Sequence, residues 1–83
     1  MINDWWDRPV RVMIRPNLTY NVASSRKAAE LLLNDWPSSR GRRHLAARKA
    51  VLRAMEHAED EAARDAAILA FVAAAREAGI LME

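Results

Sequence analysis

The chain of 83 residues has no cysteine, two glycines, three prolines and five aromatic residues. Without cysteine it has no disulfide framework, no thiolate nucleophile and no cysteine-based metal site. Gly41 and Gly79 stand far apart, so there is no glycine-rich phosphate-binding loop. The longest uncharged run in the carboxy-terminal half, residues 66–75, is half as long as a membrane span requires. With no visible signal peptide in residues 1–6, we expect a cytoplasmic protein without a membrane partner.

The apolar fraction of 52% overstates the material for a hydrophobic core. Seventeen of the apolar residues are alanine, which leaves twenty-six larger side chains. At roughly 1.5–3 kcal/mol for each fully buried large side chain, a chain of this size folds with little stability to spare. We therefore expect one domain over residues 1–83, with oligomerisation as a usual further source of stability.

Residues 9–23 have the pattern of a β-hairpin. Apolar and more polar residues alternate over residues 10–15 and again over residues 18–23, so each segment has one apolar face. Pro16 and Asn17 between them are turn residues, because proline presets one φ and asparagine tolerates the left-handed region. Two strands alone are marginal, so their apolar face is expected to lie against helices.

A first helix is predicted from an N-cap at Ser24 or Ser25 to about Trp36. Pro37 ends it, because the residue before a proline is driven out of the helical region. A second helix begins between Ser39 and Arg43. Its expected buried face consists of Ala47, Ala50, Val51, Ala54, Met55 and Ala58.

A third helix is predicted between Asp60 as N-cap and Gly79 as C-cap residue, with Ile80 placed for the apolar contact of a Schellman motif. Its apolar surface extends most of the way round, through Phe71 on one side and Leu69 and Val72 on the others. Such a helix is either central to the fold or covered by a partner subunit. The expected fold class is α+β, a two-stranded hairpin packed on three helices in the order ββααα.

Charge is sorted into two adjoining patches. Residues 40–53 contain six basic side chains and no carboxylate: Arg40, Arg42, Arg43, Arg48, Lys49 and Arg53. A mostly acidic group follows: Glu56, Glu59, Asp60, Glu61 and Asp65. Cations at a helix N-terminus oppose its macrodipole, so the first arginines stand where helix electrostatics alone would not place them.

Two interpretations of the basic patch stay open. In one, it surrounds an anion such as nucleic-acid phosphate at the helix N-terminus. The contact residues would then be Arg40, Arg42, Arg43, Lys49 and Arg53. In the other, which we favour, residues 40–43 are a loop whose arginines pair with Glu56 or Asp60. A net charge of +2 is modest, and no recognised nucleic-acid-binding motif accompanies the patch.

The three tryptophans are candidates for core and interface. Trp36 lies on the apolar stripe of the first helix and is expected in the core. Trp5 and Trp6 point in different directions on an extended chain, so one is expected to be buried and the other exposed. Exposed aromatic and apolar side chains favour a protein interface, and the candidates for it are Trp5, Trp6, Leu69 and Val72.

No catalytic or metal-binding arrangement is visible. His44 and His57 project about 140° apart on one helix and are interpreted as solvated capping residues. The serines flank helices, where capping explains them. We therefore expect a protein that is not an enzyme and that holds no metal or cofactor.

The chain resembles a family of small bacterial proteins numbered 982 among the domains of unknown function. The residues that carry the resemblance are Pro9-Val10, Val22-Ala23-Ser24, Ala28-Ala29, Leu32-Leu33, Trp36-Pro37, Gly41 and residues 70–80. The family often has an arginine shortly before the phenylalanine; here Ile68 stands in that neighbourhood and the nearest arginine is Arg64. The resemblance implies the α+β fold and a bacterial origin, but no activity.

Together these observations favour a non-enzymatic protein–protein interaction module, expected to be a homodimer. The rival hypothesis is a nucleic-acid-binding accessory protein that uses the basic start of the second helix. A third possibility stays open, in which the basic patch of one subunit meets the acidic patch of another.

Overall fold

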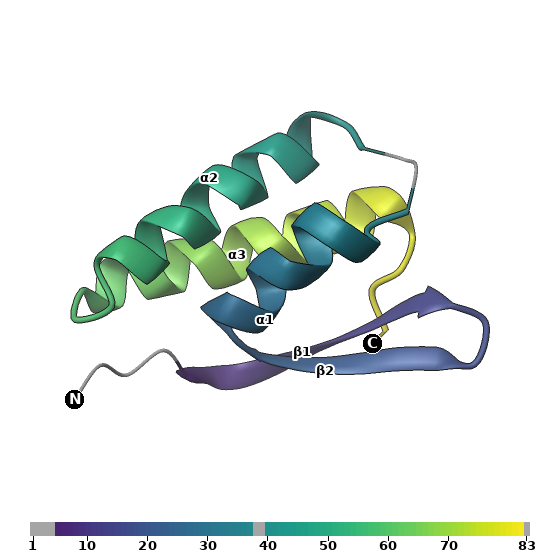
Figure 1. The fold of residues 1–83 in the computed structure, drawn as a ribbon, viewed down its shortest axis with the longest axis horizontal. Coiled ribbons are helices and arrows are strands. Elements are labelled where there is room, and N and C mark those ends of the chain that lie inside the picture. Colours follow the sequence, from purple (N-terminus) through teal and green to yellow (C-terminus); the bar gives the residue numbers. More distant parts are fainter. Residues whose placement is uncertain (1–4, 38–39, 83) are drawn as a thin grey trace.

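The predicted hairpin is confirmed. In the computed structural model, which describes residues 5–37 and 40–82, strand β1 (Trp5–Arg15) pairs antiparallel with β2 (Leu18–Ser24) (Figure 1). Asn17 in the turn has φ 70°, the left-handed conformation that asparagine tolerates better than most residues.

The first strand begins four residues earlier than the pattern indicated. Trp5 pairs with Ser24 and Val10 pairs with Val22, so residues 6–9 form a bulge opposite a single residue of β2. Pro9 lies within this bulge, where a missing backbone N–H costs no ladder hydrogen bond. The alternation read from residue 10 onward therefore captured only the regular part of β1.

The carboxy-terminal residues lie along the other edge of β1. The N–H of Met13 donates to the carbonyl of Ile80 at 2.8 Å, and the N–H of Met82 donates to the carbonyl of Arg11 at 3.0 Å. These two bonds form an isolated antiparallel bridge between Val12 and Leu81. The centre of β1 is thus paired on both sides, which the sequence pattern did not indicate.

The first helical segment has two parts. Helix α1 (Ser25–Glu30) is capped by Ser24, whose hydroxyl accepts a hydrogen bond from the N–H of Lys27 at 3.1 Å. It continues as a π-helical turn, η1 (Leu31–Asp35). Trp36 has extended backbone, φ −72° and ψ 144°, and so lies outside the helix, as expected for a residue before proline.

The other two helices begin where the sequence predicted. Helix α2 (Arg42–Glu56) starts after Gly41, and α3 (Glu61–Ala78) starts after Asp60, whose carboxylate accepts hydrogen bonds from the backbone N–H groups of Ala62 and Ala63. A carboxylate at this place satisfies helix donors and complements the macrodipole.

Helix α3 ends in the predicted Schellman motif. Gly79 has φ 73°, its N–H donates to the carbonyl of Arg76, and the N–H of Ile80 donates to the carbonyl of Ala75. Ile80 is buried, so the apolar contact of the motif is present as well. The element order is ββααα with the π turn as an extension of α1, and the fold class is α+β as predicted.

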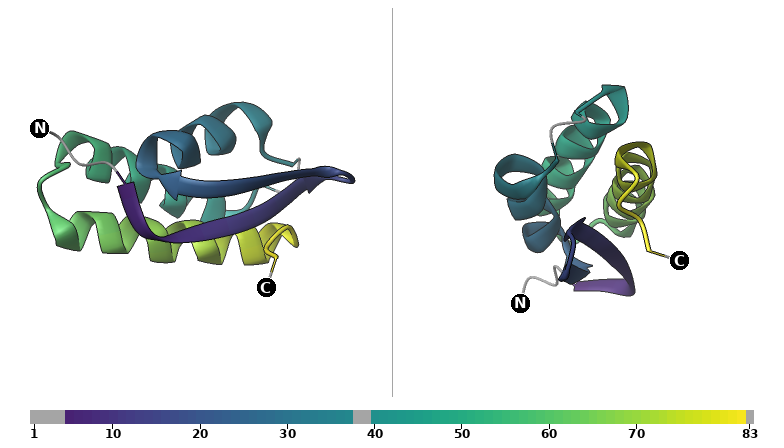
Figure 2. Two further views of the ribbon diagram at one scale, coloured as in Figure 1. Left: turned by 90° about the horizontal axis from the view of Figure 1, so that it is seen from below. Right: turned by 90° about the vertical axis from the view of Figure 1, so that its right-hand side faces the viewer.

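The three helices gather on one side of the hairpin, as Figure 2 shows in the view along the long axis. Alternate side chains of the strands, among them Val12 and Val22, are fully buried against them. At the centre, the ring of Phe71 makes edge contacts with Trp6 and Trp36, both with centroids 5.6 Å apart. The prediction that Trp36 belongs to the core is confirmed, although it follows the helix rather than lying on its stripe.

Two predictions about α2 are wrong. His44, interpreted as a solvated capping residue, is only 3% exposed; its Nε2 lies 2.8 Å from the carbonyl oxygen of Leu32 and its ring contacts Trp36. Met55, assigned to the buried face, is 40% exposed. The buried face includes Ala47 and Val51. His44 and Met55 project within about 20° of each other but lie three turns apart; Leu32 and Trp36 cover the amino end of α2, where His44 lies, and Met55 lies near the carboxyl end.

Candidate functional site

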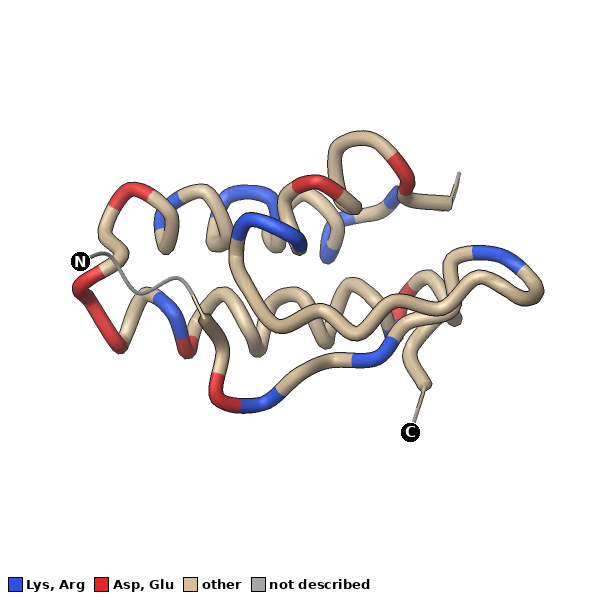
Figure 3. The backbone as a smooth tube through the Cα atoms, turned by 60° about the horizontal axis from the view of Figure 1, so that its bottom comes forward, with Lys and Arg blue, Asp and Glu red and all other residues tan. Residues whose placement is uncertain are grey.

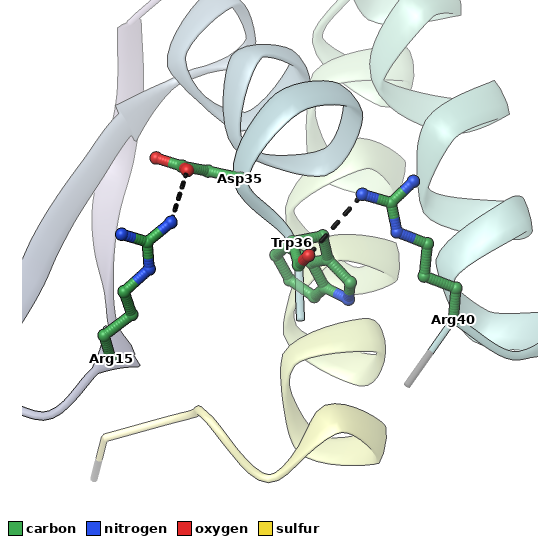
Figure 4. Close-up of polar contacts among 4 residues, drawn as sticks. All are labelled: Arg15, Asp35, Trp36 and Arg40. Atoms are coloured by element: carbon green, nitrogen blue, oxygen red, sulfur yellow. Dashed lines mark hydrogen bonds and ion pairs between the residues drawn. The ribbon is translucent and has the colours of Figure 1, made fainter. Parts of the chain in front are cut away.

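At the basic start of α2, Arg40 and Arg43 form hydrogen bonds with other groups of the chain itself. The guanidinium of Arg40 donates to the carbonyl of Trp36 at 3.5 Å, as Figure 4 shows beside the ion pair of Arg15 with Asp35. The backbone N–H of Arg43 donates to the carboxylate of Glu77 at 3.4 Å. The anion at this helix N-terminus is therefore a carboxylate from the last turn of α3.

The expected pairing of residues 40–43 with Glu56 or Asp60 is wrong. Glu56 ends α2 at the opposite end from Arg42, and Asp60 is used as the cap of α3. Helix α2 begins at Arg42, so the arginines are only partly in a loop. Glu77, which stands 34 residues after Arg43, had no signal in the sequence as a partner for the basic patch.

Three of the basic residues form one stripe on the solvent side of α2. A helix turns about 100° per residue, so Arg42, Lys49 and Arg53 lie within about 40° of one another. All three are exposed. Arg43 lies about 100° from Arg42 on the side of Glu77, and Arg48 is half-buried on the other flank. The structure thus brings together Arg42, Lys49 and Arg53, and separates Arg40 and Arg43 from them.

An apolar stripe runs beside these charges. Leu45, Leu52 and Met55 are 49%, 44% and 40% exposed, on the flank of α2 that continues from the basic stripe toward Arg48. Leu45 and Leu52 were not among the predicted interface residues. Their spacing of seven residues was the available signal, since residues seven apart lie on one face of a helix.

The acidic residues lie at the far end of α2. Glu56, Glu59 and Glu61 are exposed in or beside the turn between α2 and α3, together with Asp60. In Figure 3 the basic residues follow α2 and the acidic ones gather at this turn. The charge sorting read from the sequence is therefore also a separation along the length of one helix.

A second exposed surface lies between β1 and α3. Leu69 and Trp5 are 72% and 69% exposed. A shallow groove nearby is lined by Asp7, Arg8, Asp65, Ile68 and Leu69. Val72 is half-buried and packs against the core.

The predicted division between the neighbouring tryptophans is confirmed, with a correction. Trp5 is exposed, whereas Trp6 is 5% exposed; its indole N–H donates to the Ser25 hydroxyl at 3.0 Å and its ring contacts Phe71. Trp6 is a core residue and is removed from the candidate interface.

The described residues show no further chemical site. Within residues 5–37 and 40–82, no three His, Asp or Glu side chains converge as metal ligands. Ser24 caps α1 and Ser25 accepts from Trp6, while Ser38 and Ser39 lie outside the described residues. None of the helices in the described ranges combines the length and the hydropathy needed to cross a membrane.

Comparison with known proteins agrees with the resemblance noted from the sequence. A family model described as "Protein of unknown function (DUF982)" matches residues 8–82, which is nearly the whole chain. No curated protein and no solved structure matches the chain. The chain, with its ββααα fold and its sorted charges on α2, belongs to the DUF982 family.

Proposed function

We propose that this protein is a non-enzymatic interaction module that forms a homodimer. The observation that carries the proposal is the partly exposed apolar stripe of Leu45, Leu52 and Met55 on α2. Large apolar side chains aligned on one helix face are typical of a contact surface, whereas scattered ones need no explanation.

The composition of the core supports self-association. Most of the buried residues of α2 and α3 are alanines, for example Ala47, Ala67 and Ala74. An alanine buries far less apolar surface than leucine or phenylalanine, so each contributes little to the free energy of folding. A small domain of this kind gains stability when its exposed apolar residues are covered by a second copy.

The test is sedimentation equilibrium from micromolar to millimolar protein concentration. We expect the mean mass to rise with concentration from that of the 9.4 kDa chain toward twice that value. The thermal midpoint is expected to rise over the same range, because association stabilises the folded state by mass action. A mass of one chain throughout contradicts the proposal.

The alternative function, nucleic-acid binding, is favoured by a different observation, the exposed stripe of Arg42, Lys49 and Arg53. Three phosphate contacts predict that log affinity falls with log salt at a slope of about −3. Fluorescence anisotropy of labelled duplex DNA and single-stranded RNA, at low and near-physiological salt, tests it.

The variant for this test changes the three stripe residues to glutamine. A matched control changes three arginines of β1 that lie away from α2, Arg8, Arg11 and Arg15, and so carries the same loss of charge. Salt-dependent binding lost only in the first variant supports the alternative. Equal affinity and equal salt dependence in the two variants contradict a nucleic-acid-binding site on α2.

A further inference from the structure

We infer that two copies of this chain associate through α2, with the two α2 helices antiparallel about a twofold axis that crosses the helix near Ala50. The inference rests on the proposed homodimer and names its interface. It assigns the basic start of α2 in one copy to the acidic end of α2 in the other.

The residues of this face have the spacing of a helix–helix seam. Leu45, Arg48, Leu52 and Met55 follow one another at steps of three, four and three residues, the spacing that places side chains along one side of a helix that packs on another helix. Three of the four are large apolar residues that are 40–49% exposed, and Arg48 is half-buried. The seam spans most of the fifteen residues of α2.

The charges beside the seam identify the occupant as a second copy. Arg42 lies on one flank of the seam at the amino end of α2, and Glu56 lies on the same flank at its carboxyl end, with Lys49 midway between them. A twofold axis across the middle of α2 exchanges its two ends. Arg42 then faces the partner's Glu56, and the reverse pair forms at the other end, so one contact creates two ion pairs.

The exposed residues of the following turn extend this complementarity. Glu59, Asp60 and Glu61 add negative charge at the end where the partner's Arg40 and Arg42 arrive. A parallel arrangement would instead place like charges together at both ends, which disfavours association. The charge sorting therefore selects the antiparallel orientation.

Within a single chain the same charges are poorly placed. The first turn of α2 has two arginines and no carboxylate, and Glu56 occupies its last residue. Both positions oppose the helix macrodipole, which favours acidic residues at the N-terminus and basic ones at the C-terminus. Within the chain Glu77 accepts from the N–H of Arg43 and Arg53 lies in the last turn, and an antiparallel partner adds opposite charge beside the side chains of Arg42 and Glu56.

The surface between β1 and α3 lacks this separation of charge. Its groove has residues at helix spacing on α3, Asp65, Ile68 and Leu69, but combines Asp7, Arg8 and Asp65 with charges of both signs side by side. Leu69 on that surface is nonetheless more exposed than any residue of the seam, which makes it a matched control for substitutions on α2.

The experiment is a charge exchange followed by sedimentation equilibrium. The variants Arg42→Glu and Glu56→Arg each place like charges together at both ends of the dimer, and we expect each to self-associate about tenfold more weakly than the original chain. An equimolar mixture of the two has opposite charges at both ends, and so does the double variant. Both are expected to regain the original affinity.

Weaker self-association of the charge variants is not expected to come from a loss of folding. Glutamate at the first residue of α2 and arginine at its last both complement the macrodipole, so neither change opposes the helix. Circular dichroism of each variant checks the helix content. Two further variants, Leu52→Asp in the seam and Leu69→Asp outside it, compare the two surfaces directly.

The outcomes separate this inference from the proposed function. Dimer loss with Leu52→Asp but not Leu69→Asp, and recovery in the charge-exchange mixture, support the α2 interface. If the dimer survives Leu52→Asp, or if the mixture associates no more strongly than either variant alone, the α2 interface is overturned but the proposed homodimer is not. An original chain that stays monomeric at all concentrations overturns both.

Discussion

The Nε2–H of His44 donates a 2.8 Å hydrogen bond to the carbonyl oxygen of Leu32, joining the first turn of α2 to the π turn η1. A carbonyl can only accept, so this nitrogen carries the proton. The five-residue step of a π-helix would pair Leu32 with Pro37, which has no N–H. His44 therefore supplies the donor that the helix itself lacks, to an oxygen that is shielded from water.

Replacement of His44 by alanine is expected to lower the free energy of unfolding by about 2–4 kcal/mol, because it leaves a buried carbonyl without a donor and opens a cavity beside Trp36. Urea denaturation followed by tryptophan fluorescence measures the change. The matched control is His57→Ala at the exposed end of α2, which should stay within about 0.5 kcal/mol. Equal losses in the two variants would show that the buried bond is unimportant.

The hydrogen bond between Trp6 and Ser25 is expected to appear as coupling in a double-mutant cycle. Ser25→Ala leaves the buried indole N–H without its acceptor, which costs about 1–3 kcal/mol. In a Trp6→Phe background the same serine change should cost much less, since the donor is already absent. Denaturation of the four proteins gives the coupling energy, expected near 1 kcal/mol. A coupling of zero contradicts the bond.

Gly79 is expected to be needed for its backbone conformation alone. Its φ is 73°, and a Cβ built on it would meet no atom within 4 Å. Gly79→Ala should therefore destabilise the domain by about 1–2 kcal/mol through strain in the left-handed region. Gly79→Asn is the control, since asparagine tolerates that region, and it should cost clearly less. If the two variants have equal midpoints in thermal unfolding, the left-handed cap is not the cause.

Removal of the Glu77 side chain is expected to weaken the first turn of α2. Its carboxylate accepts from the N–H of Arg43, an acceptor worth about 0.5–1 kcal/mol at a helix N-terminus. Amide hydrogen exchange should become faster at Arg43 in Glu77→Ala. Glu77→Gln keeps an oxygen acceptor, so its exchange rate at Arg43 is expected to lie between those of the original chain and Glu77→Ala.

A second variant tests the same contact from the other side. A Cβ at Gly41 would lie 2.9 Å from the Glu77 carboxylate, so Gly41→Ala should displace that side chain and reproduce the faster exchange. Unchanged exchange at Arg43 in both alanine variants contradicts a capping role for Glu77.

Several features of this chain were determined by residues close together in the sequence. The hairpin turn at Asn17, the caps at Ser24 and Asp60, and the Schellman ending at Gly79 all formed where the pattern predicted them. Each depends on hydrogen bonds or φ angles within about five residues, so the local sequence contains the whole cause. The order of elements follows from these boundaries.

Other features depended on how the helices pack. His44 and Met55 lie on the same side of α2, so its periodicity does not say which of them is covered, and the two were assigned the wrong way round. Leu32 and Trp36 cover the end of the helix where His44 lies. The pairing of Met13 with Ile80, and of Arg43 with Glu77, joins residues more than thirty positions apart. The sequence by itself determined which segments are strands and helices and where most of them end. Only the tertiary structure decided which residues of α2 are left at the surface, because that depends on the positions of neighbouring elements rather than on local preference.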